Sequence, residues 1–223
     1  MRIDIIQFDR EVCSGTYGRW LEKWGHQCHY LLPDDAESLE SSGADALLLL
    51  GGHMGVSDRS KHPLLNKFHS FLPELVQQGK PILSICLGAQ LLADALGGRA
   101  IAGQRGERSV QQVQLTEAGC KDSLFAGVPN PFLSFQWHND SFDLPRSATH
   151  LAFTEVCPGQ AFRCQNAYGL QFHPEVDEEI VAGWCRRAKV DETALDEFRG
   201  VRMEYQQASQ RILKNFLNIV QEY

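Results

Sequence analysis

The sequence predicts an α/β fold: a mostly parallel central sheet with helices on both faces, plus a small antiparallel extension. Two observations favour this class. In the first half of the chain, short apolar runs alternate with amphipathic stretches, as in successive strand–helix units. In the second half, short strand-like runs lie close together with turn residues between them, which favours antiparallel pairing. Because no internal repeat, linker or low-complexity tract interrupts the pattern, residues 1–223 are expected to form a single domain.

The expected elements can be placed in order along the chain. In the first half, strands are predicted at residues 3–8, 26–32, 45–50 and 81–86, and helices at 16–24, 64–78 and 91–97. In the second half, strands are predicted at 110–116, 132–137, 151–154 and 161–165, followed by helices at 180–187 and 195–220. The last helix has apolar residues at helical spacing, which predicts a stripe that packs on the core.

Composition excludes several kinds of partner and compartment. The formal net charge of −7 and the lack of a basic cluster argue against nucleic-acid binding. The longest apolar run, residues 46–50, is far too short to cross a membrane, and no signal peptide is recognised. The seven cysteines are an odd number without CxxC pairs, which favours a reducing cytoplasm over a disulfide framework or a metal site. A cytoplasmic protein that binds neither nucleic acid nor membrane is therefore expected.

Cys86 stands at the most informative position of the chain. It ends an apolar strand and comes just before a helix. A nucleophile there lies on a tight turn, where the positive end of the helix stabilises a thiolate and free backbone N–H groups can hold an oxyanion. A buried cysteine that merely packs in the core would fit the same stretch.

His173 and Glu175 supply what a thiol nucleophile needs. In an extended segment residues i and i+2 point to the same side, so these two side chains can meet. An imidazole takes the proton of the thiol, and a carboxylate fixes the tautomer of the imidazole. Pro174 between them has no backbone donor, which argues against the interior of a sheet.

Four segments in this order resemble the class I (triad) glutamine amidotransferases, in particular free-standing members similar to the glutaminase domain of GMP synthase. The matching segments are residues 51–52, 85–90, 135–140 and 169–175. One such fragment is weak, but four with matching order and spacing are a specific signal. The resemblance implies the flavodoxin-like fold of that family and catalysis by a Cys–His–Glu triad.

The resemblance also implies roles for further residues. Backbone N–H groups of Gly52 and Leu87 would form the oxyanion hole, and Gly51, Gln90 and His138 would contact the substrate. Of the two candidate bases, His173 is preferred over His138, because a carboxylate lies two residues away and its motif matches better.

Two positions depart from the family pattern, one in the turn at the cysteine and one in the strand on the substrate side. Ser84 stands where the family usually has glycine two residues before the cysteine, and serine is small enough to keep the turn. Arg108 and Ser109 follow Glu107 where the family often has Ile-Gly, which leaves the identity of the γ-glutamyl substrate open.

The function that follows is hydrolysis of the glutamine side chain through a γ-glutamyl thioester, with no cofactor and no metal. The expected partners are L-glutamine or another γ-glutamyl compound and a separate synthetase that accepts the ammonia. Two alternatives stay open: a γ-glutamyl peptidase that acts on small γ-glutamyl amides, and a catalytically silent scaffold or regulatory binder.

Overall fold

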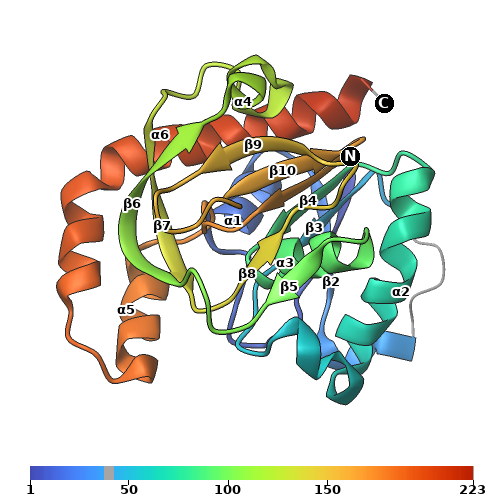
Figure 1. Cartoon of the computed structure of the whole chain (residues 1–223), viewed down its shortest axis with the longest axis horizontal. Helices are drawn as coiled ribbons and strands as arrows, with labels where there is room; N and C mark the ends of the chain where they lie inside the picture. Colours follow the sequence, from blue (N-terminus) through green and yellow to red (C-terminus); the bar gives the residue numbers. More distant parts are fainter. Residues whose placement is uncertain (38–42, 223) are drawn as a thin grey trace.

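A nine-stranded sheet runs through the protein in the order β2-β1-β3-β4-β11-β10-β9-β6-β7 (Figure 1). The computed structural model describes residues 1–37 and 43–222. Five strands form a parallel half: β1 (Arg2–Ile6), β2 (Gln27–Leu31), β3 (Ala46–Leu49), β4 (Ile82–Ile85) and β11 (Ala167–Leu170). The antiparallel half that continues from β11 consists of β10 (Ala161–Cys164), β9 (Thr149–Phe153), β6 (Glu107–Leu115) and β7 (Phe132–His138). A separate two-stranded antiparallel sheet pairs β5 (Arg99–Ile101) with β8 (Ser141–Asp143).

Helices connect these strands and cover them. The α-helices are α1 (Gly15–Lys23), α2 (Pro63–Gln77), α3 (Leu87–Ala95), α4 (Glu117–Lys121), α5 (Glu178–Ala188) and α6 (Thr193–Glu222). Within residues 1–37 and 43–222, three short 3₁₀ helices lie at Pro33–Glu37, Val56–Lys61 and Ser123–Phe125. Among the described residues, no helix has both the length and the apolar character that a membrane span requires.

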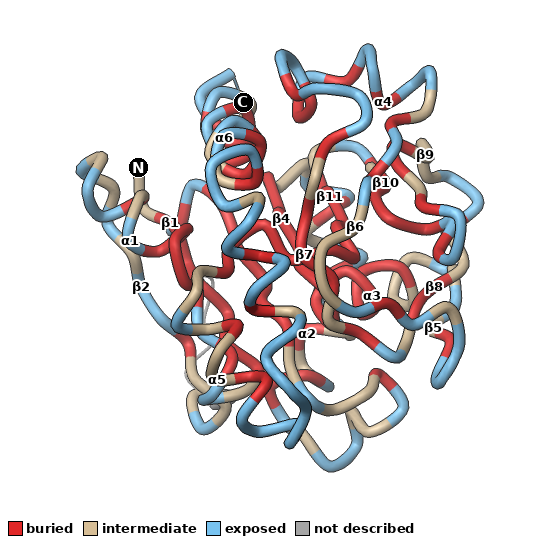
Figure 2. The backbone as a smooth tube through the Cα atoms, turned by 90° about the vertical axis from the view of Figure 1, so that its left-hand side faces the viewer, coloured by how far each residue is buried: buried red, intermediate tan, exposed pale blue. Residues whose placement is uncertain are grey.

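The two faces of the sheet are covered by different helices. Because successive residues of a strand point to opposite faces, Leu48 of β3 joins a core cluster with Tyr17 of α1 and Ile212 of α6. Its neighbour Leu49 joins the opposite cluster, which contains residues of α2 and α3. Figure 2 shows the central strands and α3 as largely buried, whereas buried and exposed residues alternate along α6. The predicted parallel sheet with helices on both faces and an antiparallel extension is confirmed.

The structure corrects several of the predicted elements. The strand β6 begins at Glu107 rather than at residue 110, and neither β11 nor α4 was predicted. The helix after Cys86 begins at Leu87 rather than at residue 91, because the backbone of Cys86 itself makes the turn. The antiparallel strands extend the main sheet, and β5 and β8 were not predicted, because three residues are too few to show a period.

Candidate active site

Cys86 occupies a strained turn between β4 and α3. Its backbone has φ 51° and ψ −110°. Residues other than glycine adopt such a conformation at a cost of about 1–3 kcal/mol. The strain is held by hydrogen bonds on both sides: the Cys86 N–H donates to the Leu170 carbonyl at 2.8 Å, and its own carbonyl accepts from the Gln90 N–H at 2.9 Å. The thiol-bearing residue thus stands between the end of a strand and the N-terminus of a helix.

A glycine two residues later lets α3 pack close to β3. A Cβ atom on Gly88 would lie 2.8 Å from the Leu49 carbonyl oxygen and 3.0 Å from the Leu49 Cβ. Only a glycine therefore allows this close contact without moving the backbone. The contact fixes the helix N-terminus, and with it the turn at Cys86.

His173 and Glu175 meet directly. His173 Nδ1 lies 2.7 Å from Glu175 Oε1, and both side chains are almost fully buried. The His173 N–H also donates to the Phe135 carbonyl at 2.8 Å, in a single antiparallel bridge to β7. Burial lowers the pKa of His173, but the negative charges of Glu175 and Cys86 have the larger combined effect, so the pKa lies above its ordinary value.

Gly51 lies where Cys86 and His173 come together. A Cβ atom on Gly51 would lie 3.3 Å from His173 Cε1 and 3.5 Å from the Cys86 Cβ. With Nδ1 bonded to Glu175, the other ring nitrogen, His173 Nε2, is buried and has no hydrogen-bond partner within residues 1–37 and 43–222. It is thus the ring atom available to exchange a proton with the thiol.

The His173–Glu175 segment is held in place by α6 and α1. The Tyr205 hydroxyl donates to the His173 carbonyl at 2.9 Å and accepts the Val176 N–H at 3.0 Å. Ser209 donates its hydroxyl to the carbonyl of Pro174. From α1, the Thr16 N–H and hydroxyl donate to the Glu175 carbonyl at 2.7 and 3.0 Å.

Tyr205 belongs to the apolar stripe predicted for the last helix, and that pattern does not reveal the hydrogen bonds of its hydroxyl. A signal was available in principle, because a buried tyrosine needs a partner for its hydroxyl. The sequence does not say which backbone group supplies that partner.

A pocket of about 270 Å³ opens beside Cys86. It is lined by Val12, Gly52, His53, Met54, Cys86, Leu87, Gln90, Arg108, Trp137, His138, Asn139, Asp140, His173, Trp184, Arg187 and Ala188. Among the described residues, neither Gly52 nor Leu87 donates its N–H in a backbone hydrogen bond, so both are free to hold an anion. The structure therefore brings both predicted oxyanion donors to the pocket that contains Cys86 and His173.

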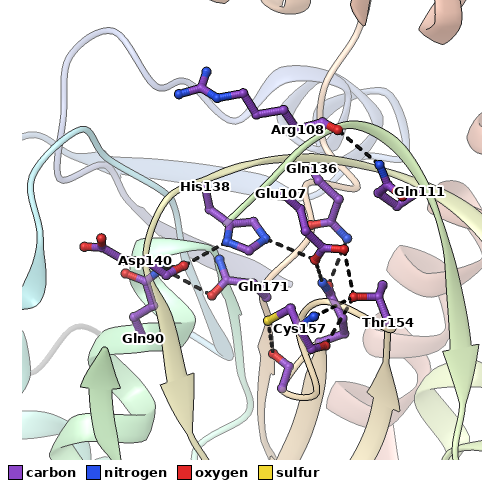
Figure 3. A network of polar contacts seen from close by, with 12 residues as sticks. Gln90, Glu107, Arg108, Gln111, Gln136, His138, Asp140, Thr154, Cys157 and Gln171 are labelled. Carbon is purple, nitrogen blue, oxygen red and sulfur yellow. Dashed lines mark hydrogen bonds and ion pairs between the residues drawn. The ribbon is translucent and has the colours of Figure 1, made fainter. Parts of the chain in front are cut away.

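Gln90 and His138 contact one backbone carbonyl at the pocket wall (Figure 3). The Asp140 carbonyl accepts from Gln90 Nε2 at 3.1 Å and lies 2.8 Å from His138 Nδ1. Gln90 Nε2 also lies 3.2 Å from Gln171 Oε1, and His138 Nε2 is 3.5 Å from Glu107 Oε2. Two of the three predicted substrate residues, Gln90 and His138, thus belong to a buried polar network in the wall of the pocket.

Glu107, His138 and Cys157 lie close enough together to hold a metal ion, but their chemistry does not suit one. The Glu107 oxygens already accept hydrogen bonds from Thr154 and Gln160. Burial, with the charge of Glu107, raises the pKa of the Cys157 thiol to about 12, so the thiolate that a metal needs is disfavoured. We assign no metal to this cluster.

A second such group, Asp9, Glu11 and His53, lies at the exposed rim of the pocket. The side chain of Arg187 contacts both Glu11 and His53, and His53 Nδ1 lies 2.5 Å from Asp9 Oδ2. These side chains contact one another. His53 is therefore part of this rim cluster.

Comparison with protein families identifies a match over most of the chain. The model of the glutamine amidotransferase class-I family matches residues 18–180. The chain is 29% identical over 197 residues to the glutamine amidotransferase-like protein YfeJ of Salmonella typhimurium, covering 85% of this chain and 82% of that protein. It is 30% identical over 143 residues to a glutamine-hydrolyzing GMP synthase subunit of Pyrococcus abyssi, covering 63% and 71% of the two chains.

Solved structures agree with these matches. A glutamine amidotransferase from Thermotoga maritima superposes with a TM-score of 0.79 at 29% identity, covering 100% of this chain and 96% of that one. A glutamine amidotransferase from Methylobacillus flagellatus gives a TM-score of 0.85 at 23% identity, covering 98% and 94%, and it supports the fold alone.

Proposed function

The chain belongs to the class I glutamine amidotransferase family, and from this premise we propose that it hydrolyses the side-chain amide of L-glutamine. Cys86 acts as nucleophile, His173 as acid and base, and Glu175 as the group that orients His173. The observation that carries the proposal is the 2.7 Å contact between His173 Nδ1 and Glu175 Oε1. His173 and the strained Cys86 line the same pocket, which the Gly52 and Leu87 residues with their free backbone N–H groups also line.

The reaction begins with attack of the Cys86 thiolate on the γ-carboxamide carbon of glutamine. The N–H groups of Gly52 and Leu87 stabilise the oxyanion, and removing one such donor typically costs about 10²–10³ in rate. The His173 imidazolium, stabilised by Glu175, gives its proton to the leaving nitrogen, and ammonia departs. A γ-glutamyl thioester remains on the sulfur.

The second half of the reaction releases glutamate. His173 takes a proton from water, the resulting hydroxide attacks the thioester carbon, and the C–S bond breaks to restore the Cys86 thiolate. Thiol, imidazole and backbone donors supply all of this chemistry, so the proposal needs no cofactor.

A separate synthetase is the partner that the proposal favours. The Pyrococcus abyssi relative is called one subunit of a GMP synthase, which implies a further polypeptide that uses the ammonia. We expect slow glutamine turnover by the isolated chain, because a small misalignment of the oxyanion donors is enough to restrain the enzyme until a partner binds. A cytoplasmic location is part of the same proposal, since the odd number of cysteines without CxxC pairs favours a reducing compartment.

The test is release of ammonia and glutamate from glutamine by the purified protein, with Cys86→Ala as the matched control. Hydrolysis that the control lacks supports the proposal. Faster cleavage of γ-glutamyl peptides than of glutamine would favour the peptidase alternative. No hydrolysis, together with an unreactive Cys86, would favour the scaffold.

A further inference from the structure

One wall of the pocket consists of aromatic side chains, and the guanidinium of Arg108 lies at its end. The His173 ring packs edge-on against Trp184 with centroids 4.8 Å apart, and Trp184 packs against Trp137 at 6.1 Å. The Arg108 guanidinium lies over the Trp137 ring at 4.5 Å, and the two residues are direct partners across β6 and β7. All four side chains line the pocket.

We propose that this wall binds the leaving group of the substrate, and that Arg108 binds a carboxylate on it. The substrate class is then γ-glutamyl amides of amino acids or short peptides, in addition to glutamine. This inference rests on the γ-glutamyl chemistry proposed for Cys86 and names the leaving groups that the same site accepts.

The position of His173 decides which part of the substrate faces the wall. His173 must give its proton to the leaving nitrogen, so that nitrogen lies next to the His173 ring. Any substituent on the nitrogen extends from His173 along the neighbouring rings of Trp184 and Trp137. Ammonia, the leaving group of glutamine, has no substituent and uses none of this surface.

The positive charge of Arg108, at the end of this wall, favours a leaving group that carries a carboxylate. Two arginines line the pocket, and Arg187 already pairs with Glu11. Across residues 1–37 and 43–222, no carboxylate oxygen lies within 4.0 Å of the Arg108 guanidinium, which donates instead to the amide oxygen Asn139 Oδ1 at 3.3 Å. In Figure 3 the guanidinium points away from the carboxylate of the preceding residue, Glu107.

Arg108 is therefore an exposed cation that lies over the ring of Trp137 and has no carboxylate partner among the described residues. A guanidinium that lies over a ring can still donate from its N–H edge, and that edge matches the two oxygens of a carboxylate. The contact with the indole ring of Trp137 also restricts the Arg108 side chain, so less side-chain freedom is lost when a carboxylate binds.

The balanced reaction is that proposed for glutamine, with an amine in place of ammonia. The Cys86 sulfur forms a bond to the γ-carbon as the carbon–nitrogen bond breaks, and His173 gives its proton to the departing amine. Water then hydrolyses the thioester. One γ-glutamyl amide and one water thus give glutamate and one amino acid or peptide.

The test compares matched substrates that differ only in the distant charge. Two lengths are used, γ-glutamylglycine and γ-glutamylalanylglycine, each as the free acid and as the C-terminal amide, with glutamine as a fifth substrate. For at least one length we expect kcat/KM for the acid to exceed that for the amide by about 10-fold, equivalent to about 1.4 kcal/mol.

Arg108→Gln should remove this preference and Arg108→Lys should retain part of it. The control is Arg99→Gln, an exposed arginine paired with Asp143 outside the pocket, which should keep the preference.

Three results would overturn the inference while leaving the proposed function intact. The first is an equal kcat/KM for acid and amide at both lengths. The second is a preference that survives Arg108→Gln. The third is an equal loss in Arg108→Gln on all five substrates, glutamine included, which would place the α-carboxylate of the γ-glutamyl group against Arg108. The proposed function itself fails by a different result: no substrate releases glutamate, or release persists in Cys86→Ala.

Discussion

The hydroxyl of Tyr205 in α6 donates a hydrogen bond of 2.9 Å to the backbone carbonyl of His173, 32 residues earlier in the chain. The same oxygen accepts the Val176 N–H at 3.0 Å, so one side chain holds both ends of the segment that carries His173 and Glu175. Burial and the charge of Glu175 raise the pKa of Tyr205 well above its ordinary value, so the hydroxyl keeps its proton at neutral pH. The C-terminal helix thereby positions the proposed base.

Replacing this hydroxyl should reduce stability and activity together. Tyr205→Phe leaves a buried N–H and a buried carbonyl without their partner, which costs about 1–3 kcal/mol in free energy of unfolding. Urea unfolding measures the loss, and kcat for glutamine should fall as well. Tyr30→Phe is the control, because its exposed hydroxyl contacts Glu22 at 3.2 Å, and we expect a change below about 0.5 kcal/mol. Equal effects of the two changes would contradict the positioning role.

Cys86 should be the one cysteine that activity requires. A glutamine analogue such as diazo-oxo-norleucine should label it with one equivalent at neutral pH, because the reagent binds as substrate before it reacts. Mass spectrometry locates the label, and Cys86→Ala should abolish both labelling and turnover. The exposed Cys13 provides the control, since Cys13→Ala should change neither. Label that remains in Cys86→Ala would refute the assignment.

His173→Ala should cost more activity than Glu175→Gln. The base touches the reacting atoms, whereas the carboxylate acts through it, and in a serine-protease triad the two losses differ by roughly 100-fold. Steady-state kinetics on glutamine gives both values, and His138→Ala serves as the comparison for the choice of base. If His138→Ala and His173→Ala lose equal activity, the base stays unassigned; full activity in His173→Ala would refute the triad.

The alkaline limb of the pH–rate profile should move in Glu175→Gln. The charges of Glu175 and Cys86 raise the pKa of His173 against the opposing effect of burial, so the imidazolium that protonates the leaving nitrogen persists to higher pH. The substitution removes one raising charge and leaves the burial, so the pKa of His173 falls and activity is lost at lower pH than in the parent. A profile of kcat/KM against pH measures the shift. An unchanged limb, or a shift to higher pH, would contradict the electrostatic account.

Two glycine substitutions should change stability in opposite directions. In Gly88→Ala the new methyl group meets the Leu49 carbonyl at 2.8 Å and pushes α3 from β3, at a cost of about 1–3 kcal/mol and with loss of turnover. In Gly200→Ala the methyl group on α6 meets nothing within 4 Å, and the higher helix propensity of alanine should add about 0.5–1 kcal/mol. Thermal unfolding compares the two variants. A stable, active Gly88→Ala protein would show that the close contact is not required.

Much of the local structure could be predicted because it depends on neighbouring residues. The strand that ends at Cys86 and the extended segment from His173 to Glu175 follow from patterns within ten residues. The roles of Tyr205 and Thr16 could not be predicted, since their partners are backbone carbonyls far along the chain. For the same reason the pattern did not reveal that Arg108 would lie over Trp137 on the His173 side of the pocket.

By itself, the sequence determined the periodicity of the strands and helices, the position of a thiol before a helix, and the two-residue spacing of His173 and Glu175. The tertiary structure alone decided that Cys86 and His173 line one pocket, where a Cβ atom on Gly51 would lie within 3.5 Å of both residues. β4 and β11 are neighbouring parallel strands with Ile85 paired to Leu170, so Cys86 and the His173 segment emerge together at their carboxyl ends. Hydrophobic alternation specifies which face of a strand is buried but not which strand lies beside it. That choice depends on long-range packing of the whole sheet and its helices.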